Sequence, residues 1–397
     1  MDHRACDVPH GRRRVGRGAH TRPAGAGVGQ PVVSRATGDG PSHHTAGGDR
    51  GTRDQRPSDV RVGTDDHIVG FNGFRRSVGS GGASTDGRLL MQTDGPVRRL
   101  DARAMGTTIS VFGPGLAGFD DAARRVIDTF AIEEDRFSRF RSGSELSRVN
   151  ASAGSWMTIS QEFATLLGFA LDHAAATDGL FDPSVLRAME AAGYDRDLDE
   201  VIQAARGALH PPVACGRWRE IELDHRGLRM PRDVSIDLGG VAKGWTVDLA
   251  TERALGAGLP WVLVSAGGDL RIAGDAPPLE IEVEDPDELD RSLASLRLRG
   301  GAIATSSTRR RSWGPGLHHV IDPRTGAPSA TGIVQATVWA PTCAEAEIAS
   351  TVSLLEGTEG AALRTSLLVG EDGTVLHSFA DEQGDGADAP AGAGVAA

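Results

Sequence analysis

The segment DLGGVAKGWTVD, residues 237–248, holds Lys243, the only lysine in a chain whose other basic side chains are all arginine. Two glycines, Gly239 and Gly240, precede it where a helix is expected to begin. Glycine lets a ligand approach the backbone, and the free amide groups of a helix start attract anions. Lysine adds a compact point charge that a planar guanidinium would not replace. The segment therefore predicts a phosphate site; the alternative is a lysine kept by chance on a solvated face.

The same segment disfavours two common nucleotide-binding patterns. It matches neither the Walker A loop nor the G-x-G-x-x-G fingerprint, which argues against a nucleoside triphosphatase and against a nicotinamide-binding Rossmann domain. Asp237 opens the segment and is a candidate acceptor for a hydroxyl or an imide group of the ligand. Asp237 and Lys243 are therefore the two candidate catalytic residues.

A second candidate lies on a helix that we expect over residues 342–356. Thr342 and Glu345 have the T-x-x-E spacing of a capping box, which gives Glu345 a structural role. Glu347 and Thr351 are four residues apart, so the helix presents a carboxylate and a hydroxyl on one face. Mg2+ takes oxygen ligands of this kind and adds water and substrate phosphate oxygens. A surface glutamate beside a threonine is the alternative interpretation.

The pattern elsewhere mixes helices and strands without a regular βαβ period. Helices are predicted over 119–137, over 161–177 with Gly179 as the stop signal, and from the glycines of residues 237–244 to Leu255. Strands are predicted over 104–112 (entered through Met105 and Gly106), 261–274 (interrupted by Gly267 and Gly268), 279–284, 301–305, 317–321 and 333–340, and a closing pair of strands over 367–376. We therefore predict an α+β fold, a single domain over residues 91–380 with mixed, largely antiparallel sheets flanked by helices, rather than a doubly wound sheet.

Residues 1–90 contain 14 Arg and 9 Asp but no Lys or Glu, and they show no apolar periodicity. Such a segment cannot bury enough apolar surface to offset the entropy of ordering. We interpret it as a disordered extension, or as upstream sequence that is not translated, since Met91 is followed by chain that looks foldable. A basic arm for nucleic acid is the weaker alternative, because aspartates are interspersed and aromatic residues are not. Residues 381–397 are acidic and rich in Gly and Ala, so we expect a disordered tail.

The charge balance argues against nucleic acid as a partner. The chain has 42 basic and 54 acidic residues, and setting aside residues 1–90 leaves 28 basic and 45 acidic residues, a net charge of −17. Such a field disfavours nucleic acid and anionic membranes. Neither a signal peptide nor a run of about 18 apolar residues is visible, so we expect a cytoplasmic protein without membrane insertion. Three widely spaced cysteines fit a reducing compartment and argue against a disulfide scaffold or a cysteine zinc site.

Three further segments are polar, punctuated by glycine and adjacent to expected strands: DGLFDPSV (178–185), AGGDLRIAG (266–274) and HHVIDPRTGAP (318–328). Tight turns alone would explain them. In the third, His318 and His319 suggest a metal or base role, but neighbours in a strand point to opposite faces. At most one of the two histidines is therefore expected to face a site.

Taken in order, these segments resemble the ApbE family, the FAD:protein FMN transferases. The resemblance covers about residues 101–357 and rests on eight motifs: AMGTTISVF, SGSELSRVN, DGLFDPSV, DLGGVAKGWTVD, VSAGGDLRIAG, IATSS, HHVIDPRTGAP and EAEIASTVSLLEG. It implies an α+β enzyme that binds FAD and Mg2+, cleaves the diphosphate and attaches FMN through a phosphoester to a threonine of a partner protein, with release of AMP. The acceptor threonine is expected in an exposed Ser/Asp-Gly-Ala/Ser-Thr motif.

The resemblance also implies a set of site residues. Those placed to contact FAD are Met105, Phe140, Leu180, Phe181, Asp182, Asp237, Lys243 and Ile321. The metal would be held by the carbonyl of Gly240 and the side chains of Glu347 and Thr351. Two positions depart from the family pattern, since Phe140 stands where tyrosine is common and Glu347 where aspartate is usual. Two alternatives stay open here: a Mg2+-dependent FAD pyrophosphatase giving FMN and AMP, and a flavin-binding protein without turnover.

Overall fold

The structure is a computed structural model and describes residues 90–91, 96–203, 211–288, 291–362, 364–379 and 394–396. All of them belong to one of the two units into which the chain divides, Arg56–Ala397. The expected N-terminal extension, residues 1–90, lies outside the described residues except for Leu90. Of the expected tail, residues 381–397, only 394–396 are described, and they form a short strand.

The centre of the fold is an eight-stranded sheet with the strand order β17-β16-β15-β10-β7-β6-β3-β2. Every pair of neighbouring strands in it is antiparallel. Its strands are β2 (Val97–Ala104), β3 (Thr107–Pro114), β6 (Trp261–Ala266), β7 (Asp269–Gly274), β10 (Gly301–Ser307), β15 (Ile333–Ala340), β16 (Ser366–Gly370) and β17 (Val375–His377). The prediction of a largely antiparallel sheet is confirmed, and β15 has the predicted bounds.

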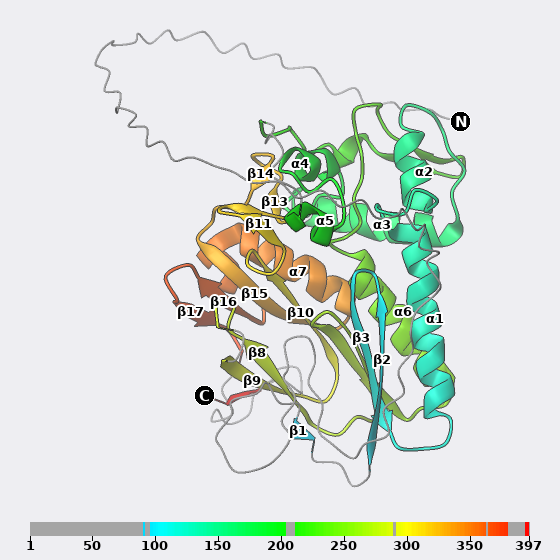
Figure 1. Cartoon of the computed structure of the whole chain (residues 1–397), viewed down its shortest axis with the longest axis vertical. Helices are drawn as coiled ribbons and strands as arrows, with labels where there is room; N and C mark the ends of the chain where they lie inside the picture. Colours follow the sequence, from blue (N-terminus) through cyan, green and yellow to red (C-terminus); the bar gives the residue numbers. More distant parts are fainter. Residues whose placement is uncertain are drawn as a thin grey trace, which may run out of the picture. The chain divides into compact units, whose positions relative to one another are not determined.

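Both faces of this sheet are covered, so it separates two apolar cores (Figure 1). On one face lie α1 (Phe119–Phe137), α6 (Ala242–Gly256) and α7 (Cys343–Glu356). On the other lies the hairpin of β8 (Leu279–Glu284) and β9 (Ser292–Leu298), flanked by β1 (Leu90–Met91) and β18 (Gly394–Ala396). Burial on both faces explains the apolar run WVLVSA of β6: Val262 and Val264 pack under the helices, whereas Trp261 and Leu263 pack under the hairpin.

A third core joins α7 to a group of short helices and loops. The remaining helices are α2 (Glu145–Ala151), α3 (Gln161–Ala176), α4 (Leu186–Ala191), α5 (Leu198–Gln203), η1 (Trp218–Glu220) and η2 (Gly357–Ala362). The remaining strands form three two-stranded sheets: β4 (Glu222–Asp224) with β5 (Gly227–Arg229), β11 (Ser312–Gly314) with β12 (Leu317–His318), and β13 (Ile321–Asp322) with β14 (Ala327–Pro328). Several motif segments lie in the loops of this region.

Three strand predictions were wrong in detail. The strand predicted over 104–112 begins only at Thr107, because Met105 and Gly106, with φ of 50° and 68°, form the turn between β2 and β3 and Ala104 belongs to β2. Gly267 and Gly268, with φ of 63° and 102°, likewise form the turn between β6 and β7. Two residues with positive φ are typical of the tight hairpin turns that match strand twist. The expected strand over 317–321 is also divided, because β12 ends at His318 and β13 begins at Ile321.

The helix predictions agree more closely with the structure. Helix α1 has the predicted bounds, and α3 ends just before Gly179, whose N–H donates to the carbonyl of Ala174 at 2.8 Å. Such a backbone bond from a left-handed glycine satisfies a carbonyl at a helix end. The capping box of α7 is confirmed, since Thr342 and Glu345 exchange side-chain to backbone hydrogen bonds.

Helices α6 and α7 cap each other. The carboxylate of Asp248 on α6 accepts the N–H groups of Cys343 and Ala344, both at 2.9 Å, at the start of α7. In return, Glu347 of α7 accepts the N–H of Gly244 near the start of α6 at 2.8 Å. A helix leaves its first amide groups without intrahelical partners, and a carboxylate is a strong acceptor for them. The two helix starts are therefore held together side by side.

Among the helices that the structure describes, none combines the length and the apolar character needed to cross a membrane.

We predict that Gly244→Ala destabilises the protein by about 1–3 kcal/mol, the usual cost of overpacking a tight contact. A Cβ at this position would lie 2.5 Å from the carbonyl oxygen of Cys343, so the two helix starts would have to separate. Denaturant unfolding followed by circular dichroism measures the effect.

Gly256→Ala, near the end of the same helix, is the matched control because a Cβ there meets no atom within 4 Å. This variant should be neutral or gain up to about 1 kcal/mol from helix propensity. Equal stability changes in the two variants would contradict the argument from close packing.

Candidate functional site

Lys243 lies in a cluster of buried charges at the start of α6. Its Nζ atom is 2.7 Å from Oε1 of Glu347 and forms a second ion pair with Oδ2 of Asp269. The lysine side chain is only 14% exposed, and the two carboxylates are 5% and 7% exposed. The other oxygen of Asp269, Oδ1, accepts the N–H of Thr305 at 3.0 Å. The lysine therefore does not lie on a solvated face, and two carboxylates against one ammonium leave the cluster with excess negative charge.

Glu347 and Thr351 lie on the side of α7 that faces this cluster and β10. Both oxygens of Glu347 are engaged, Oε1 by Lys243 and Oε2 by the N–H of Gly244. A carboxylate oxygen has two acceptor sites, so each retains one. The hydroxyl of Thr351 is 3.0 Å from the Oγ of Ser306. The two side chains that the resemblance assigns to a metal thus retain acceptor capacity in this arrangement.

The residues present fit a hard cation such as Mg2+. Gly240 is half-buried on the segment that leads into α6, and an added Cβ would lie 3.5 Å from the ring of Phe181. Within the described ranges, no group of three or more His, Cys, Asp or Glu side chains is arranged to hold a metal ion. A cation here would depend on a carbonyl, a hydroxyl, one carboxylate and oxygens from water or phosphate. This donor set suits Mg2+ better than zinc or iron.

Asp237 is positioned by the backbone around it. Its N–H donates to the carbonyl of Pro183 at 2.8 Å, and its Oδ2 accepts the N–H of Gly239 at 2.9 Å. The preceding residue, Ile236, is held on both sides by Asn150 of α2, which accepts its N–H at 2.8 Å and donates to its carbonyl at 2.9 Å. The segment that enters α6 is therefore tied both to α2 and to the loop over residues 178–185.

A cationic and aromatic group lies beside Asp237. The Nε of Arg139, just after the end of α1, is 3.3 Å from Oδ1 of Asp237. The same guanidinium lies over the rings of Phe140 and Tyr194, at 4.2 Å and 4.3 Å from their centroids. Phe140 is 42% exposed, whereas Ile321 is buried in a cluster with Tyr194. The side chain of Phe140 is thus more accessible to a ligand than the side chain of Ile321.

Asp182 has a structural role in this structure. Its Oδ1 accepts the N–H and the hydroxyl of Ser184 at 2.7 Å and 2.6 Å, and its Oδ2 accepts the N–H of Gly216 at 2.6 Å. Burial raises the pKa of the Asp182 carboxyl, and these hydrogen bonds oppose that rise. Leu180 and Phe181 of the same loop pack in the third core. The backbone of this loop and the side chain of Phe181 are therefore better candidates for ligand contact than the carboxylate of Asp182.

Met105 lies in the β2–β3 turn, which is next to the β6–β7 turn that precedes Asp269. The N–H of Gly267, in the β6–β7 turn, donates to the carbonyl of Thr108 on β3 at 3.1 Å. Met105 itself is half-buried against the core under the helices. Its turn therefore neighbours the charged cluster, although no recorded contact among the described residues joins Met105 to Lys243.

The two histidines of the HHVIDPRTGAP segment have different surroundings. His318 is held through Nε2, which lies 3.1 Å from the carbonyl of Ser329. Burial, together with the charges of Arg311, His318 and Lys243, lowers the pKa of the His319 imidazole to about 3. The Nδ1 atoms of both rings are buried without a hydrogen-bond partner among the described residues. His319 is thus a neutral imidazole whose pKa responds to the charge of Lys243.

Sequence reasoning missed two residues of this site, Asp269 and Arg139. Asp269 follows the double glycine of the AGGDLRIAG segment, and that pattern was the available signal, because the turn brings its carboxylate to Lys243. Arg139 had no comparable signal, since the sequence around it, FSRFRSG, is rich in exposed-looking arginine. Its burial depends on contacts with residues far away in the chain.

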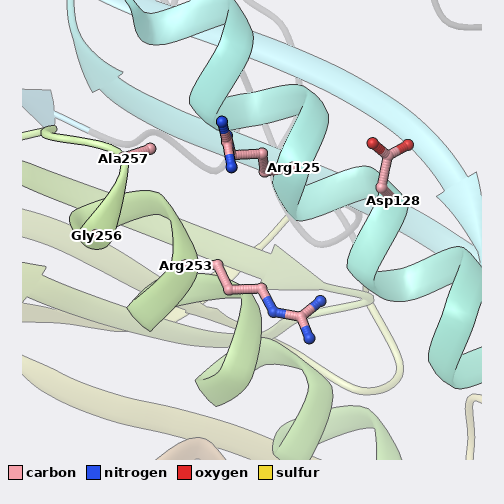
Figure 2. Close-up of a pocket in the computed structure, with 5 residues that line it drawn as sticks. All are labelled: Arg125, Asp128, Arg253, Gly256 and Ala257. Carbon is pink, nitrogen blue, oxygen red and sulfur yellow. The ribbon is translucent and has the colours of Figure 1, made fainter.

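A surface pocket of about 650 Å³ lies elsewhere on α6 (Figure 2). It is lined by Arg125 and Asp128 of α1 and by Arg253, Gly256 and Ala257 at the end of α6. Arg253 lies about 15 Å along the helix from Lys243, at a rise of about 1.5 Å per residue. The pocket also faces the end of the helix that repels anions. It is therefore separate from the candidate site.

Comparison with known proteins identifies similar chains. The model of the ApbE family matches residues 105–368. The FAD:protein FMN transferase of Vibrio cholerae is 27% identical over 274 residues, which cover 66% of this chain and 81% of that protein. The FAD:protein FMN transferase of Rhodobacter capsulatus is 29% identical over 336 residues, covering 77% of this chain and 62% of that protein.

Solved structures show the same similarity. The crystal structure of the ApbE protein from Thermotoga maritima superposes with a TM-score of 0.63 at 25% identity, covering 71% of this chain and 97% of that chain. The flavin transferase ApbE from Vibrio cholerae superposes with a TM-score of 0.57 at 24% identity and covers 71% of this chain and 96% of that chain. The α+β fold predicted from the sequence is thus the fold of these proteins.

We predict that the protein loses stability as the pH is lowered, partly because of His319. Its pKa of about 3 lies below the ordinary 6.5, so the unfolded chain binds a proton that the folded protein does not. The contribution of His319 to the free energy of unfolding is therefore fully present above pH 6.5. It is lost as the pH falls towards 3, at about 1.4 kcal/mol per pH unit. Between about pH 7 and pH 5 the wild type should lose about 2 kcal/mol more than His319→Gln in urea unfolding.

The control is His225→Gln, since His225 is exposed on the β4–β5 turn. This variant should show the same loss of stability between the two pH values as the wild type. An unchanged pH dependence in His319→Gln would show that His319 is not a buried neutral imidazole.

Proposed function

The chain belongs to the ApbE family, whose model matches residues 105–368, and on this basis we propose that it is an FAD:protein FMN transferase. The structural observation that carries the proposal is Lys243 at a helix start between the carboxylates of Asp269 and Glu347. A helix start, a cation and oxygen ligands for Mg2+ are what transfer at a diphosphate requires. The enzyme is a transferase with two partners, FAD and an acceptor protein.

The reaction exchanges one phosphorus–oxygen bond for another. The hydroxyl oxygen of an acceptor threonine attacks the FMN phosphorus of FAD, the bond to the bridging oxygen breaks, and AMP leaves with that oxygen. No nucleophile from this chain is needed. The protein's contribution is to hold the diphosphate and to stabilise its charge while the acceptor approaches.

Each part of the α6 start has a role in this proposal. Gly239 and Gly240 let the diphosphate approach the backbone, and Lys243 donates to its oxygens. The carbonyl of Gly240, the carboxylate of Glu347 and the hydroxyl of Thr351 would hold Mg2+, which when bound neutralises charge on the diphosphate. Glu347 would then interact with the ion while its other oxygen keeps the N–H of Gly244.

The threonine proton needs an acceptor, and His319 is our candidate. Its imidazole is neutral and has a buried Nδ1 without a hydrogen-bond partner among the described residues. The low pKa makes the free imidazole a weak base. A bound diphosphate would raise that pKa, because nearby negative charge favours the protonated ring. The base would thus become effective when FAD is in place.

The remaining contacts with FAD are proposals of the same kind. They are assigned to Met105, Phe140, Leu180, Phe181, Asp182, Asp237, Lys243 and Ile321. The exposed ring of Phe140 and the position of Phe181 beside Gly240 support two of these assignments. For Asp182, whose carboxylate is occupied within its loop, the backbone is the better candidate. We further propose an exposed Ser/Asp-Gly-Ala/Ser-Thr motif in the acceptor and the cytoplasm as the compartment.

The test is mass spectrometry of the full chain mixed with FAD, MgCl2 and an acceptor domain that carries the proposed threonine motif. We expect a phosphoester-linked FMN on the threonine and an equal amount of AMP. Free FMN with AMP and an unmodified acceptor would show a pyrophosphatase instead. Intact FAD in all mixtures would indicate a flavin-binding protein without turnover. An acceptor with threonine replaced by valine is the control for the site of attachment.

We predict that Glu347→Gln abolishes Mg2+-dependent turnover, whereas Glu347→Asp retains it in part. The amide keeps the shape of the side chain but loses its negative charge. It therefore no longer forms an ion pair with Lys243, and its neutral oxygen binds a hard cation more weakly than a carboxylate does. The aspartate is the residue usual in the family and keeps the charge. Titration of MgCl2 against turnover measures the difference.

Glu345→Gln is the matched control on the same helix, because Glu345 serves the capping box and not the charged cluster. The Glu345→Gln variant should keep the Mg2+ dependence of the wild type. Its free energy of unfolding should fall by no more than about 2 kcal/mol, the upper value for a lost helix cap. A Glu347→Gln enzyme with the Mg2+ dependence of the wild type would remove this residue from the metal site.

A further inference from the structure

Arg139 is a buried cation with one unused donor. Its side chain is 8% exposed, with Nε paired to Asp237 and Nη1 donating to the carbonyl of Tyr194 at 2.8 Å. Its plane is fixed by the rings of Phe140 and Tyr194. The remaining nitrogen, Nη2, is buried and has no hydrogen-bond partner among the described residues.

An unused buried donor of this kind is unusual. Leaving a buried polar group without a partner costs about 1–3 kcal/mol, and more when the group is charged. Most such groups in native proteins are satisfied by the protein, by water or by a ligand. Arg139 lies over the faces of the Phe140 and Tyr194 rings, and neither ring provides a hydrogen-bond partner for Nη2. The free N–H group is therefore held ready for an acceptor that comes from outside the chain.

The direction of this donor follows from the geometry of the guanidinium group. Nε and Nη2 form one edge of the planar group, so their hydrogens point to the same side. Nε lies 3.3 Å from Oδ1 of Asp237, in an ion pair. Nη2 is bonded to the same carbon as Nε and therefore lies close to that carboxylate. A fixed donor and a fixed acceptor therefore stand next to each other, with the partly exposed ring of Phe140 adjoining them.

Such a pair matches the polar edge of a heteroaromatic ring. A flavin presents an N–H between two carbonyl oxygens, and adenine presents an amino group beside a ring nitrogen acceptor. Both edges place a donor next to an acceptor, which complements Asp237 and Arg139 respectively. Aromatic rings also stack favourably on an aromatic face such as Phe140.

We propose that Arg139 contacts FAD directly, and that Arg139 and Asp237 together bind the donor–acceptor edge of one of its two ring systems. The inference rests on the proposed function, since it takes FAD as the ligand. It adds a binding residue that the sequence motifs did not indicate. It also explains why a charged side chain is buried at the end of α1 with one nitrogen unpaired.

The alternative is that Arg139 only supports the fold by holding Asp237 and Tyr194. Arg139→Lys separates the two roles, because lysine keeps the positive charge near Asp237 but has no second N–H at a fixed angle. Arg141→Gln is the matched control: Arg141 is a 46% exposed arginine two residues along the chain, paired with Glu134. It tests whether removal of any nearby positive charge affects binding.

The experiment measures binding rather than turnover. Quenching of flavin fluorescence by the full chain gives the Kd for FAD, and displacement of FAD by FMN or by AMP reports each half of the molecule separately. We expect Arg139→Lys to weaken FAD binding about tenfold or more, the scale of one charge-assisted hydrogen bond. We also expect the loss to appear with only one of FMN and AMP, which identifies the ring system, at an unchanged melting temperature.

Three results would overturn the inference. These are FAD affinity equal to that of the wild type, equal losses for FMN and AMP, and an equal loss in Arg141→Gln. Failure of the wild type itself to bind FAD would instead overturn the proposed function, and this inference with it. The two failures are therefore distinguishable from the wild-type titration alone.

Discussion

The reciprocal capping of α6 and α7 is the interaction on which the site depends. Asp248 binds the amide groups at the start of α7, and Glu347 binds an amide near the start of α6. The absence of a side chain at Gly244 permits the close approach that both bonds need. Because Glu347 also pairs with Lys243, the contact that joins the helices simultaneously positions the charged cluster. The carboxylate of Glu347 therefore both joins the two helices and forms part of the candidate site.

The central sheet contributes the second half of the cluster. Its β6–β7 turn places Asp269 against Lys243, and β10 supplies the backbone N–H that orients the aspartate and the Ser306 hydroxyl beside Thr351. Apolar cores cover both faces of the sheet that carries these turns and strand ends, and such interiors are close-packed. Such preorganised charges can stabilise a diphosphate without reorganising during the reaction. The excess of carboxylates over ammonium groups in this cluster would favour the divalent cation that we propose.

Local patterns accounted for much of the fold. Apolar periodicity predicted α1 and α3, the Thr342–Glu345 spacing predicted the cap of α7, and the apolar run predicted β15. The errors came at Met105–Gly106 and Gly267–Gly268, where two-residue turns join strands that the sequence alone left merged or unrecognised. A tight turn and an interruption of one strand have the same local composition. Only pairing between the strands distinguishes them.

The sequence by itself determined the α+β class, the lone lysine after two glycines, the pairing of Glu347 with Thr351 on one helix face and the order of the family motifs. These features depend on residues a few positions apart, so local spacing suffices to identify them. Tertiary structure alone decided that Lys243 meets Asp269 and Glu347, that Asp182 is occupied within its loop, and that Arg139 is buried beside Asp237 with a free nitrogen. Those contacts join segments far apart in the chain. Their energetics depend on exclusion of water, which no local pattern specifies.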